Sequence, residues 1–451
     1  MNESRRARLQ EELARCMRCG FCQAACPVYR ERGTEFSVAR GKLILIEAVL
    51  DGRIGLTRDV RDALEACLLC KSCRAACPSG VRTDVILAAA RELAAERYGH
   101  GLLKTAAFAA LKRPALLAAA AGAGAHLWGL AFAPEDGGDL WRLRLPPGNL
   151  YPRLPRRSLL SRLGAGELGA TAAAGGRAMK VSPDTVRGTV ILFPGCLVNF
   201  MLPQVGLAAI KVLLSMGSEV IVPSGQACCG TPLYVNGDRA GAGRLAETNL
   251  SWLASAGAAA SGGGPPVVFV CPSCAESWRG YPEMVREEWT ALARQVADRV
   301  TDISIFLTRR GPEEFLAGLA AAAGRPGRGD AGPRVTVTYH DPCHLAQAQG
   351  VRVEPRALLR SLPGVALKEM AEPGGCCGSG GTFGLFHPDL SRRIGGRKAG
   401  DITATEAVTV ATGCPACLLQ LRQELSAAGR SAVGVRHTVE LLAEVVDAGR
   451  K

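Results

Sequence analysis

The chain has 451 residues, more than one hydrophobic core usually holds, so we expect two or three domains. Hydrophobic residues make up 48% of the sequence, which excludes a disordered protein. The formal charge of +13 is compatible with attraction to anionic lipid or an acidic partner, or with arginines spread over a solvated surface. Aromatic residues are scarce and do not alternate with basic stretches, so we expect no nucleic-acid binding.

The chain contains 18 cysteines, but it is too long for a small secreted scaffold held by disulfides. Its first residues have a charged helical pattern without the apolar core of a secretion signal. We therefore expect a cytoplasmic protein, whose thiolates stay available for metal.

The first hundred residues contain two cysteine motifs of the form C-x2-C-x2-C-x3-C-P. The first consists of Cys16, Cys19, Cys22 and Cys26, and the second of Cys67, Cys70, Cys73 and Cys77. This spacing is the bacterial ligation pattern of [4Fe–4S] clusters, so we expect two cubane clusters close together. Structural zinc is the alternative, but a zinc site closes with four ligands and gives no reason for this repeated spacing.

Apolar residues recur at helical spacing over residues 38–49, 60–69 and 84–98. The two motifs also lie further apart than in the small β-rich ferredoxins. We therefore expect residues 1–100 to form an α-helical dicluster ferredoxin domain.

Residues 101–187 are expected to be helical at first and then to form a linker. Residues 114–133 carry no charged side chain and are barely long enough to span a bilayer. Three interpretations stay open: a helix buried in this chain or against a partner, a peripheral membrane contact through residues 101–135, or a membrane span. Residues 136–187 are rich in proline, glycine and arginine, which is typical of a linker.

The last part of the chain contains an internal duplication. Five cysteines occur twice in the same order, with a period of about 145 residues. The first set is Cys196, Cys228, Cys229, Cys271 and Cys274, and the second is Cys343, Cys376, Cys377, Cys414 and Cys417. We expect two homologous modules, at residues 188–325 and 326–451.

Short apolar runs precede the first and fourth cysteine of each set, at residues 189–193, 267–270, 334–339 and 407–411. Each run is typical of a buried parallel strand, and helical patterns lie between the runs. This alternation predicts open α/β sheets, whose ligands bind beyond the carboxyl ends of the strands. The sequence thus predicts that the five thiols of each module gather at one rim of a sheet.

Five thiols per module exceed the four ligands of a cubane cluster or a zinc ion. The adjacent cysteines Cys228-Cys229 and Cys376-Cys377 direct their side chains differently along an extended backbone. An opened or distorted iron–sulfur cluster, or one with a bridging thiolate, therefore fits these modules better than a cube. Zinc or a redox disulfide at one module stays open, as does a plain buried thiol for any single cysteine.

His340 and His344 flank Cys343 and are the candidate catalytic residues, as hydrogen-bond donors to a cluster or as proton carriers. His340 could equally cap a strand. No G-x-G-x-x-G motif follows a predicted strand, and the sequence has no Walker loop or HExxH motif. The chain thus has residues that carry electrons but lacks a site for the organic cofactor that takes hydride from a substrate, which indicates a partner subunit.

The chain resembles the iron–sulfur subunits of glycolate oxidase and of related D-lactate dehydrogenases over nearly its whole length. The same tandem cysteine-rich (CCG) modules occur in heterodisulfide reductase subunits and in the C subunit of anaerobic glycerol-3-phosphate dehydrogenase. The resemblance rests on the two cysteine motifs, on Cys77-Pro-Ser-Gly80, on both CCG modules and on the segment from Gly378 to Leu390.

The resemblance also implies which thiols bind which cluster. It assigns Cys16, Cys19, Cys22 and Cys77 to the first cubane, and Cys67, Cys70, Cys73 and Cys26 to the second. In the heterodisulfide reductase family, CCG modules hold noncubane [4Fe–4S] clusters, so one or two such clusters are implied here. Some glycolate oxidase subunits have degenerate CCG cysteines, whereas both modules are complete in this chain.

The expected fold is an α+β multidomain protein, with an N-terminal α-helical dicluster ferredoxin followed by two homologous α/β open-sheet CCG modules. The implied function is electron transfer in a flavin-dependent 2-hydroxy-acid dehydrogenase complex, with flavin on a partner subunit and a quinone or another acceptor. Its location would be cytoplasmic, or peripheral at the inner face of the membrane. The alternatives are a heterodisulfide-reductase-type catalytic subunit and a zinc-binding scaffold.

Overall fold

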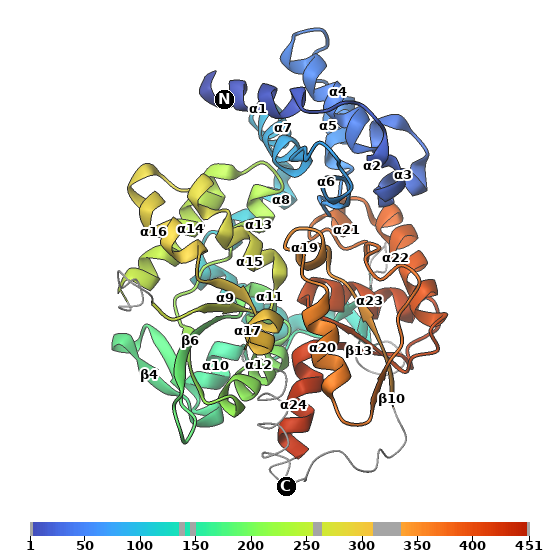
Figure 1. Ribbon diagram of the computed structural model, residues 1–451. Helices are drawn as coiled ribbons and strands as arrows, with labels where there is room; N and C mark the ends of the chain where they lie inside the picture. The colour runs from blue at the N-terminus through green and yellow to red at the C-terminus, as the bar shows by residue number, and fades with distance from the viewer. Residues whose placement is uncertain (1–2, 135–139, 145–149, 256–263, 310–334, 449–451) are drawn as a thin grey trace.

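The computed structural model describes residues 3–134, 140–144, 150–255, 264–309 and 335–448. Helices at the N-terminus form one end of the molecule, and two α/β modules lie side by side beneath them (Figure 1). The first module runs from green to yellow and the second from orange to red. The predicted fold class is confirmed, with a helical N-terminal domain followed by two open-sheet modules.

The N-terminal domain is helical. Its elements are α1 (Glu3–Ala14), α2 (Phe21–Ala25), α3 (Pro27–Arg32), the 3-10 turn η1 (Glu35–Ser37), α4 (Ala39–Leu50), α5 (Arg58–Glu65), α6 (Ser72–Ala75) and α7 (Thr83–Tyr98). The apolar face of α4 packs with α5 and α7, and Ile46, Leu64 and Ile86 are almost fully buried in their shared core. This packing holds both cysteine motifs on short loops at the edge of one small core.

Two apolar helices follow, α8 (Gly101–Leu111) and α9 (Pro114–Ala131). A small antiparallel sheet comes next, made of β1 (Phe132–Pro134), β2 (Leu140–Leu143) and β3 (Leu150–Pro152). Within the described ranges, α9 is the one helix long and apolar enough to cross a membrane, and only 6% of it is buried. The interpretation of α9 as a helix buried in this chain is therefore wrong, whereas contact with a partner or a membrane stays open.

The first module contains a six-stranded sheet in the order β4-β5-β7-β6-β8-β9. Its strands are β4 (Thr171–Ala173), β5 (Ala178–Val181), β6 (Gly188–Phe193), β7 (Ser218–Pro223), β8 (Val267–Phe269) and β9 (Val300–Asp302). Its helices and turns are α10 (Leu159–Gly164), η2 (Glu167–Gly169), η3 (Ala174–Gly176), α11 (Gly195–Phe200), α12 (Pro203–Ser215), α13 (Thr231–Tyr234), α14 (Arg239–Ser255), α15 (Pro272–Arg279), η4 (Tyr281–Glu283), α16 (Glu287–Ala297) and α17 (Ile303–Arg309).

The expectation that residues 136–187 form a linker is wrong for α10 and for strands β4 and β5, which belong to the first module. Strand β5 pairs antiparallel with β7 and buries Ala178 and Val181, so the first sheet begins before residue 188. Helix α10 also buries Leu159 and Leu163 in the core of this module. These segments are short and lie between glycine- and arginine-rich stretches, so their periodicity is too brief to stand out in the sequence.

The second module contains a parallel four-stranded sheet in the order β11-β10-β12-β13. Its strands are β10 (Val335–His340), β11 (Val365–Leu367), β12 (Thr409–Thr412) and β13 (Gly434–His437). Its helices are α19 (Cys343–Ala346), α20 (Val353–Ser361), α21 (Phe383–Phe386), α22 (Pro388–Thr403), α23 (Pro415–Ala427) and α24 (Thr438–Ala448). Strands β7-β6-β8-β9 of the first module have the same order, which the duplicated sequence predicts. The boundary expected between residues 325 and 326 lies outside the described residues.

The two modules share a hydrophobic core. Helix α12 of the first module packs against α24 of the second, and side chains of both lie in one buried cluster. An ion pair between Lys211 and Asp447, with 2.7 Å between nitrogen and oxygen, closes the edge of this contact. The shared core fixes the two sheets relative to each other, and with them the cysteines that follow the strands.

Candidate metal centres

The two ferredoxin motifs have the same loop conformation. Arg18 and Leu69 occupy matching positions in their motifs, and both have a positive φ, 56° and 52°. Gly20 and Lys71 match in the same way, with φ of 89° and 63°. Residues other than glycine rarely adopt this left-handed conformation, and such strain collects at functional sites. Here it gives both motifs the same loop shape, which fits a loop wrapped around a metal cluster.

The thiols of Cys26, Cys67, Cys70 and Cys73 surround a small cavity. Burial, together with the charge of neighbouring thiols, raises the pKa of both Cys26 and Cys70 to about 12. Apolar burial of four thiols that must ionise together is costly without a compensating cation. The structure thus brings Cys26 to the second motif, as the resemblance implies, and the donor set fits an iron–sulfur cluster.

The other four ferredoxin cysteines are Cys16, Cys19, Cys22 and Cys77. Cys16 and Cys77 pack against the same hydrophobic cluster, and Cys22 lies close enough to Cys16 to feel its charge. Cys19 is exposed on the same loop. The assignment of these four to the first cubane remains a prediction.

In each module, cysteines follow the carboxyl ends of the two central strands. Cys196 follows β6 and Cys271 follows β8, while Cys343 follows β10 and Cys414 follows β12. The remaining six come from the CCG loops and from the first turns of α15 and α23. The predicted gathering of thiols at one sheet rim is therefore what the structure displays for both modules.

Contacts between sulfur atoms run through each set of five. In the first module, Cys228 interacts with Cys196 and Cys229, and Cys274 with Cys229 and Cys271. In the second, Cys376 interacts with Cys343 and Cys377, and Cys417 with Cys377 and Cys414. The sulfur atoms of Cys377 and Cys417 are 3.3 Å apart. Each set forms one compact group of soft donors, which suits iron–sulfur clusters or zinc.

Each group also contains stabilised thiolates. Hydrogen bonds from Cys376 and Cys417 lower the pKa of Cys377 to about 5. Bonds from Cys228 and Cys274 likewise lower the pKa of Cys229. Thiolates bind metal, so these buried pairs are poised for ligation.

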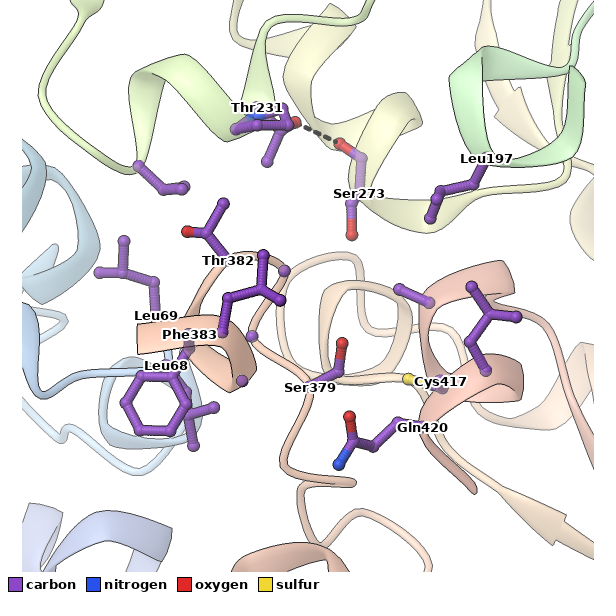
Figure 2. A pocket seen from close by; sticks show the side chains of 18 of the residues that line it. Leu68, Leu69, Leu197, Thr231, Ser273, Ser379, Thr382, Phe383, Cys417 and Gln420 are labelled. Carbon is purple, nitrogen blue, oxygen red and sulfur yellow. Dashed lines mark hydrogen bonds between the residues drawn. The ribbon is translucent and has the colours of Figure 1, made fainter. Parts of the chain in front are cut away.

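Thiols from all three domains line one cavity. Its volume is 460 Å³, and its lining includes Cys70 of the ferredoxin domain together with Cys274 and Cys417 of the two modules. Figure 2 shows Leu68 and Leu69 entering this pocket from one side, with Thr231 and Ser273 opposite Ser379 and Gln420. Cys271 and Cys414 contact each other across the module boundary, while Cys70 lies near Cys343. The thiols therefore form a series of neighbours from Cys70 of the ferredoxin domain through the second module to the first.

Hydrogen bonds from side chains that the sequence analysis did not identify hold the backbone of the first CCG loop. The side-chain oxygen of Asn249 accepts from the Ala227 N–H at 2.9 Å, and its nitrogen donates to the Cys228 carbonyl at 3.2 Å. The hydroxyls of Ser277 and Tyr281 donate to the Cys229 carbonyl, at 2.7 and 3.2 Å. These bonds satisfy buried backbone groups of the loop and fix where its two thiols point. No motif marks such partners, because they lie on separate helices.

His344 lies at the junction of the three domains. Its Nδ1 bonds with Glu276 of α15, whose other oxygen pairs with the Lys71 ammonium. Lys71 also pairs with Asp84, at 3.1 Å. Lys71, Glu276 and His344 each lie within two residues of a candidate ligand, so this network links one group of thiols from each of the three domains.

His340 is buried among the thiols of the second module. Neither of its ring nitrogens has a hydrogen-bond partner among the described residues. One of its ring nitrogens and the sulfur atoms of Cys377 and Cys417 all lie within 4.8 Å of one another. Burial lowers the pKa of His340 to about 3, so the imidazole is neutral at pH 7.

The comparisons with known proteins agree with this architecture. The cysteine-rich domain called CCG matches residues 190–277 and 337–422, and a 4Fe-4S dicluster domain matches residues 12–81. The chain is 29% identical to the probable glycolate oxidase iron-sulfur subunit of Bacillus subtilis, with 100% of this chain and 97% of that protein covered.

Two further relatives each match about half of this chain. The lactate utilization protein A of Bacillus velezensis is 31% identical, with 56% of this chain and 98% of that protein covered. One of the subunits of fumarate reductase (CoM/CoB) from Methanothermobacter marburgensis is 34% identical, with 55% of this chain and 45% of that protein covered. Since both cysteine-rich domains and the dicluster domain are present, the chain belongs to the family of iron–sulfur proteins that includes the glycolate oxidase iron–sulfur subunits.

Proposed function

We propose that this chain is the electron-transfer subunit of an oxidoreductase complex that oxidises a 2-hydroxy acid, such as glycolate or lactate. The names of its relatives support this class of reaction. The observation that carries the proposal is the series of neighbouring thiols that runs from Cys70 of the ferredoxin domain through Cys343 to the contact of Cys271 with Cys414. Such a series suits the passage of electrons between centres inside one protein.

The donor sets would hold two cubane [4Fe–4S] clusters and one noncubane cluster in each CCG module. Bound clusters would supply one-electron redox chemistry. The residues of this chain fix the positions of the thiols, exclude water with apolar walls such as Leu68 and Leu69, and stabilise thiolates such as Cys377. The hydride chemistry of the hydroxy acid would belong to a flavoprotein subunit, since the sequence has no dinucleotide motif.

We further propose that the complex lies on the inner face of the cytoplasmic membrane and passes electrons to a quinone or a similar acceptor. Helices α8 and α9 support this location, because Leu102 is 93% and Leu130 is 77% exposed. The sequence from residue 101 to residue 134 contains no acidic residue, and Lys104, Lys112 and Arg113 lie beside its apolar stretches. Such a surface suits an anionic bilayer.

The proposal is tested by isolating the complex from its host. We expect a flavoprotein to co-purify with this chain, and a Cys70→Ser variant to lose electron transfer from the hydroxy acid to a quinone analogue while the flavoprotein still reduces its own flavin. Full transfer from hydroxy acid to acceptor in a complex that lacks this chain would reject the proposal.

A second function is favoured by the 460 Å³ cavity between two complete CCG modules. A heterodisulfide-reductase-type subunit would cleave a disulfide there, and each sulfur would accept an electron and leave as a thiolate. Addition of a disulfide to the reduced protein would then reoxidise its clusters. If no disulfide reoxidises them, only the electron-transfer role remains.

A further inference from the structure

His340 is the last residue of β10, three residues before Cys343. Its side chain is 1% exposed, and neither Nδ1 nor Nε2 has a hydrogen-bond partner within the described part of the chain. Buried polar groups are normally paired, so an imidazole with two unpaired nitrogens indicates a ligand or water at that place. The nearest candidate partners are the sulfur atoms of Cys377 and Cys417, which share a 4.8 Å group with a nitrogen of the ring.

The other fully buried histidine, His437, has a hydrogen-bond partner for each ring nitrogen. His437 Nε2 bonds with the Val270 carbonyl at 3.0 Å, and its Nδ1 accepts from the Val439 N–H at 3.3 Å. Both of its nitrogens are therefore used within the protein. His340 is equally buried and uses neither, although it lies beside the sulfur atoms of Cys377 and Cys417.

The first module has a different residue at the matching place. Phe193 ends β6 and lies three residues before Cys196, as His340 does before Cys343. Its ring packs against Phe269 and Trp278, with ring centroids 5.4 and 4.8 Å away. The matching strand partner of His340 is Thr412, whose hydroxyl is also unpaired among the described residues. An aromatic wall in the first module is thus replaced by polar atoms in the second.

We propose that His340 binds the metal centre of the second CCG module through one imidazole nitrogen, beside Cys377 and Cys417. The inference rests on the proposed function only in taking the CCG modules as iron–sulfur sites. A neutral imidazole gives a centre less negative charge than a thiolate, and histidine ligation raises the reduction potential of iron–sulfur centres. The two modules would therefore hold chemically different centres, and the second would have the higher potential.

The test uses the full chain, assembled with iron and sulfide without oxygen and labelled with ¹⁵N only at histidine. Pulsed EPR of the reduced protein should detect one strongly coupled histidine nitrogen. The variant His340→Cys should lose this coupling completely while its iron and sulfide contents stay unchanged, because a thiolate replaces the imidazole. The variants His344→Gln and His437→Gln should keep the coupling, since their rings serve other contacts.

Three results would overturn the inference. The first is a wild-type protein that has iron in both CCG modules but no strongly coupled nitrogen. The second is a nitrogen coupling that persists in His340→Cys. The third is zinc in place of iron at the second module. The first two leave electron transfer from the flavoprotein intact, so they separate this inference from the proposed function. A protein without iron in either module would instead contradict the assignment on which both depend.

Discussion

Cys271 of the first CCG module and Cys414 of the second contact each other through their side chains, although 142 residues lie between them in the chain. Each follows an inner parallel strand of its own sheet, β8 or β12. The contact lowers the pKa of Cys414, because Cys271 donates to its sulfur. The two sheets therefore face each other with their ligand rims in contact, so centres held by the two modules would be neighbours.

Because each ferredoxin cluster is expected to take ligands from both motifs, variants in different motifs should lose the same cluster. The variants Cys26→Ser and Cys73→Ser should lose the same EPR signal, since both side chains lie in the second group, and each should lose about four irons per chain. Cys16→Ser and Cys77→Ser should lose the other signal. Iron analysis and EPR of the reduced variants check this pattern. A loss shared by Cys26→Ser and Cys16→Ser would mean that each motif binds its own cluster.

The junction of the three domains predicts a measurable loss of stability. In a Glu276→Gln variant, the buried Lys71 ammonium keeps Asp84 but loses its second carboxylate, and one amide oxygen replaces the two carboxylate oxygens that bond with Lys71 and His344. We expect the free energy of unfolding in urea to fall by about 2 kcal/mol. Glu283→Gln is the matched control, since Glu283 forms an exposed pair with Arg82 between the same two domains. The control should change stability by less than about 0.5 kcal/mol, and equal effects would contradict the account.

Glu424 predicts how stability depends on pH. Burial raises the pKa of this carboxyl from 4.5 to about 7. The folded chain then holds the proton more tightly than the unfolded chain, so the free energy of unfolding should fall as pH rises from 4.5 to about 7. We expect roughly 2 kcal/mol after allowance for solvent screening. Glu424→Gln should flatten this part of the curve of unfolding free energy against pH, measured by urea unfolding. An unchanged slope would mean that another group causes the pH dependence.

The exposed face of α9 predicts binding to lipid. Replacing Leu127 and Leu130 with aspartate should weaken binding to vesicles with anionic lipid at least about tenfold, because two apolar anchors become charged. Val353→Asp, at an exposed apolar residue of α20, is the control and should bind as the wild type does. Sedimentation with vesicles measures both. Equal binding of all three proteins would favour a protein partner for α9.

Much of this architecture follows from the sequence, because binding a metal cluster requires cysteines at particular spacings. The two ferredoxin motifs and the repeated sets from Cys196 and Cys343 predicted the domain types and the thiols at the strand ends. The strands β4 and β5 were missed because each has at most four residues and lies among glycines. The exposure of α9 could not be predicted, since an apolar helix has the same composition in a core, at a partner surface or in a bilayer.

Contacts between elements that are distant in the sequence could not be predicted either. Nothing in the chain relates Glu276 to Lys71 and His344, because the three residues come from three domains. The meeting of Cys271 with Cys414 likewise depends on how α12 and α24 pack. By contrast, the exchange of Phe193 for His340 is visible once the two modules are aligned on their cysteines.

The central claim is that the thiols hold iron–sulfur centres close enough to act as one electron path. EPR of the fully reduced chain, assembled without oxygen, tests it most directly. We predict signals from both ferredoxin clusters and from the CCG modules, broadened by magnetic interaction between the centre bound through Cys70 and the one bound through Cys343 and Cys376. Narrow, independent signals, or zinc without iron in the CCG modules, would contradict the account.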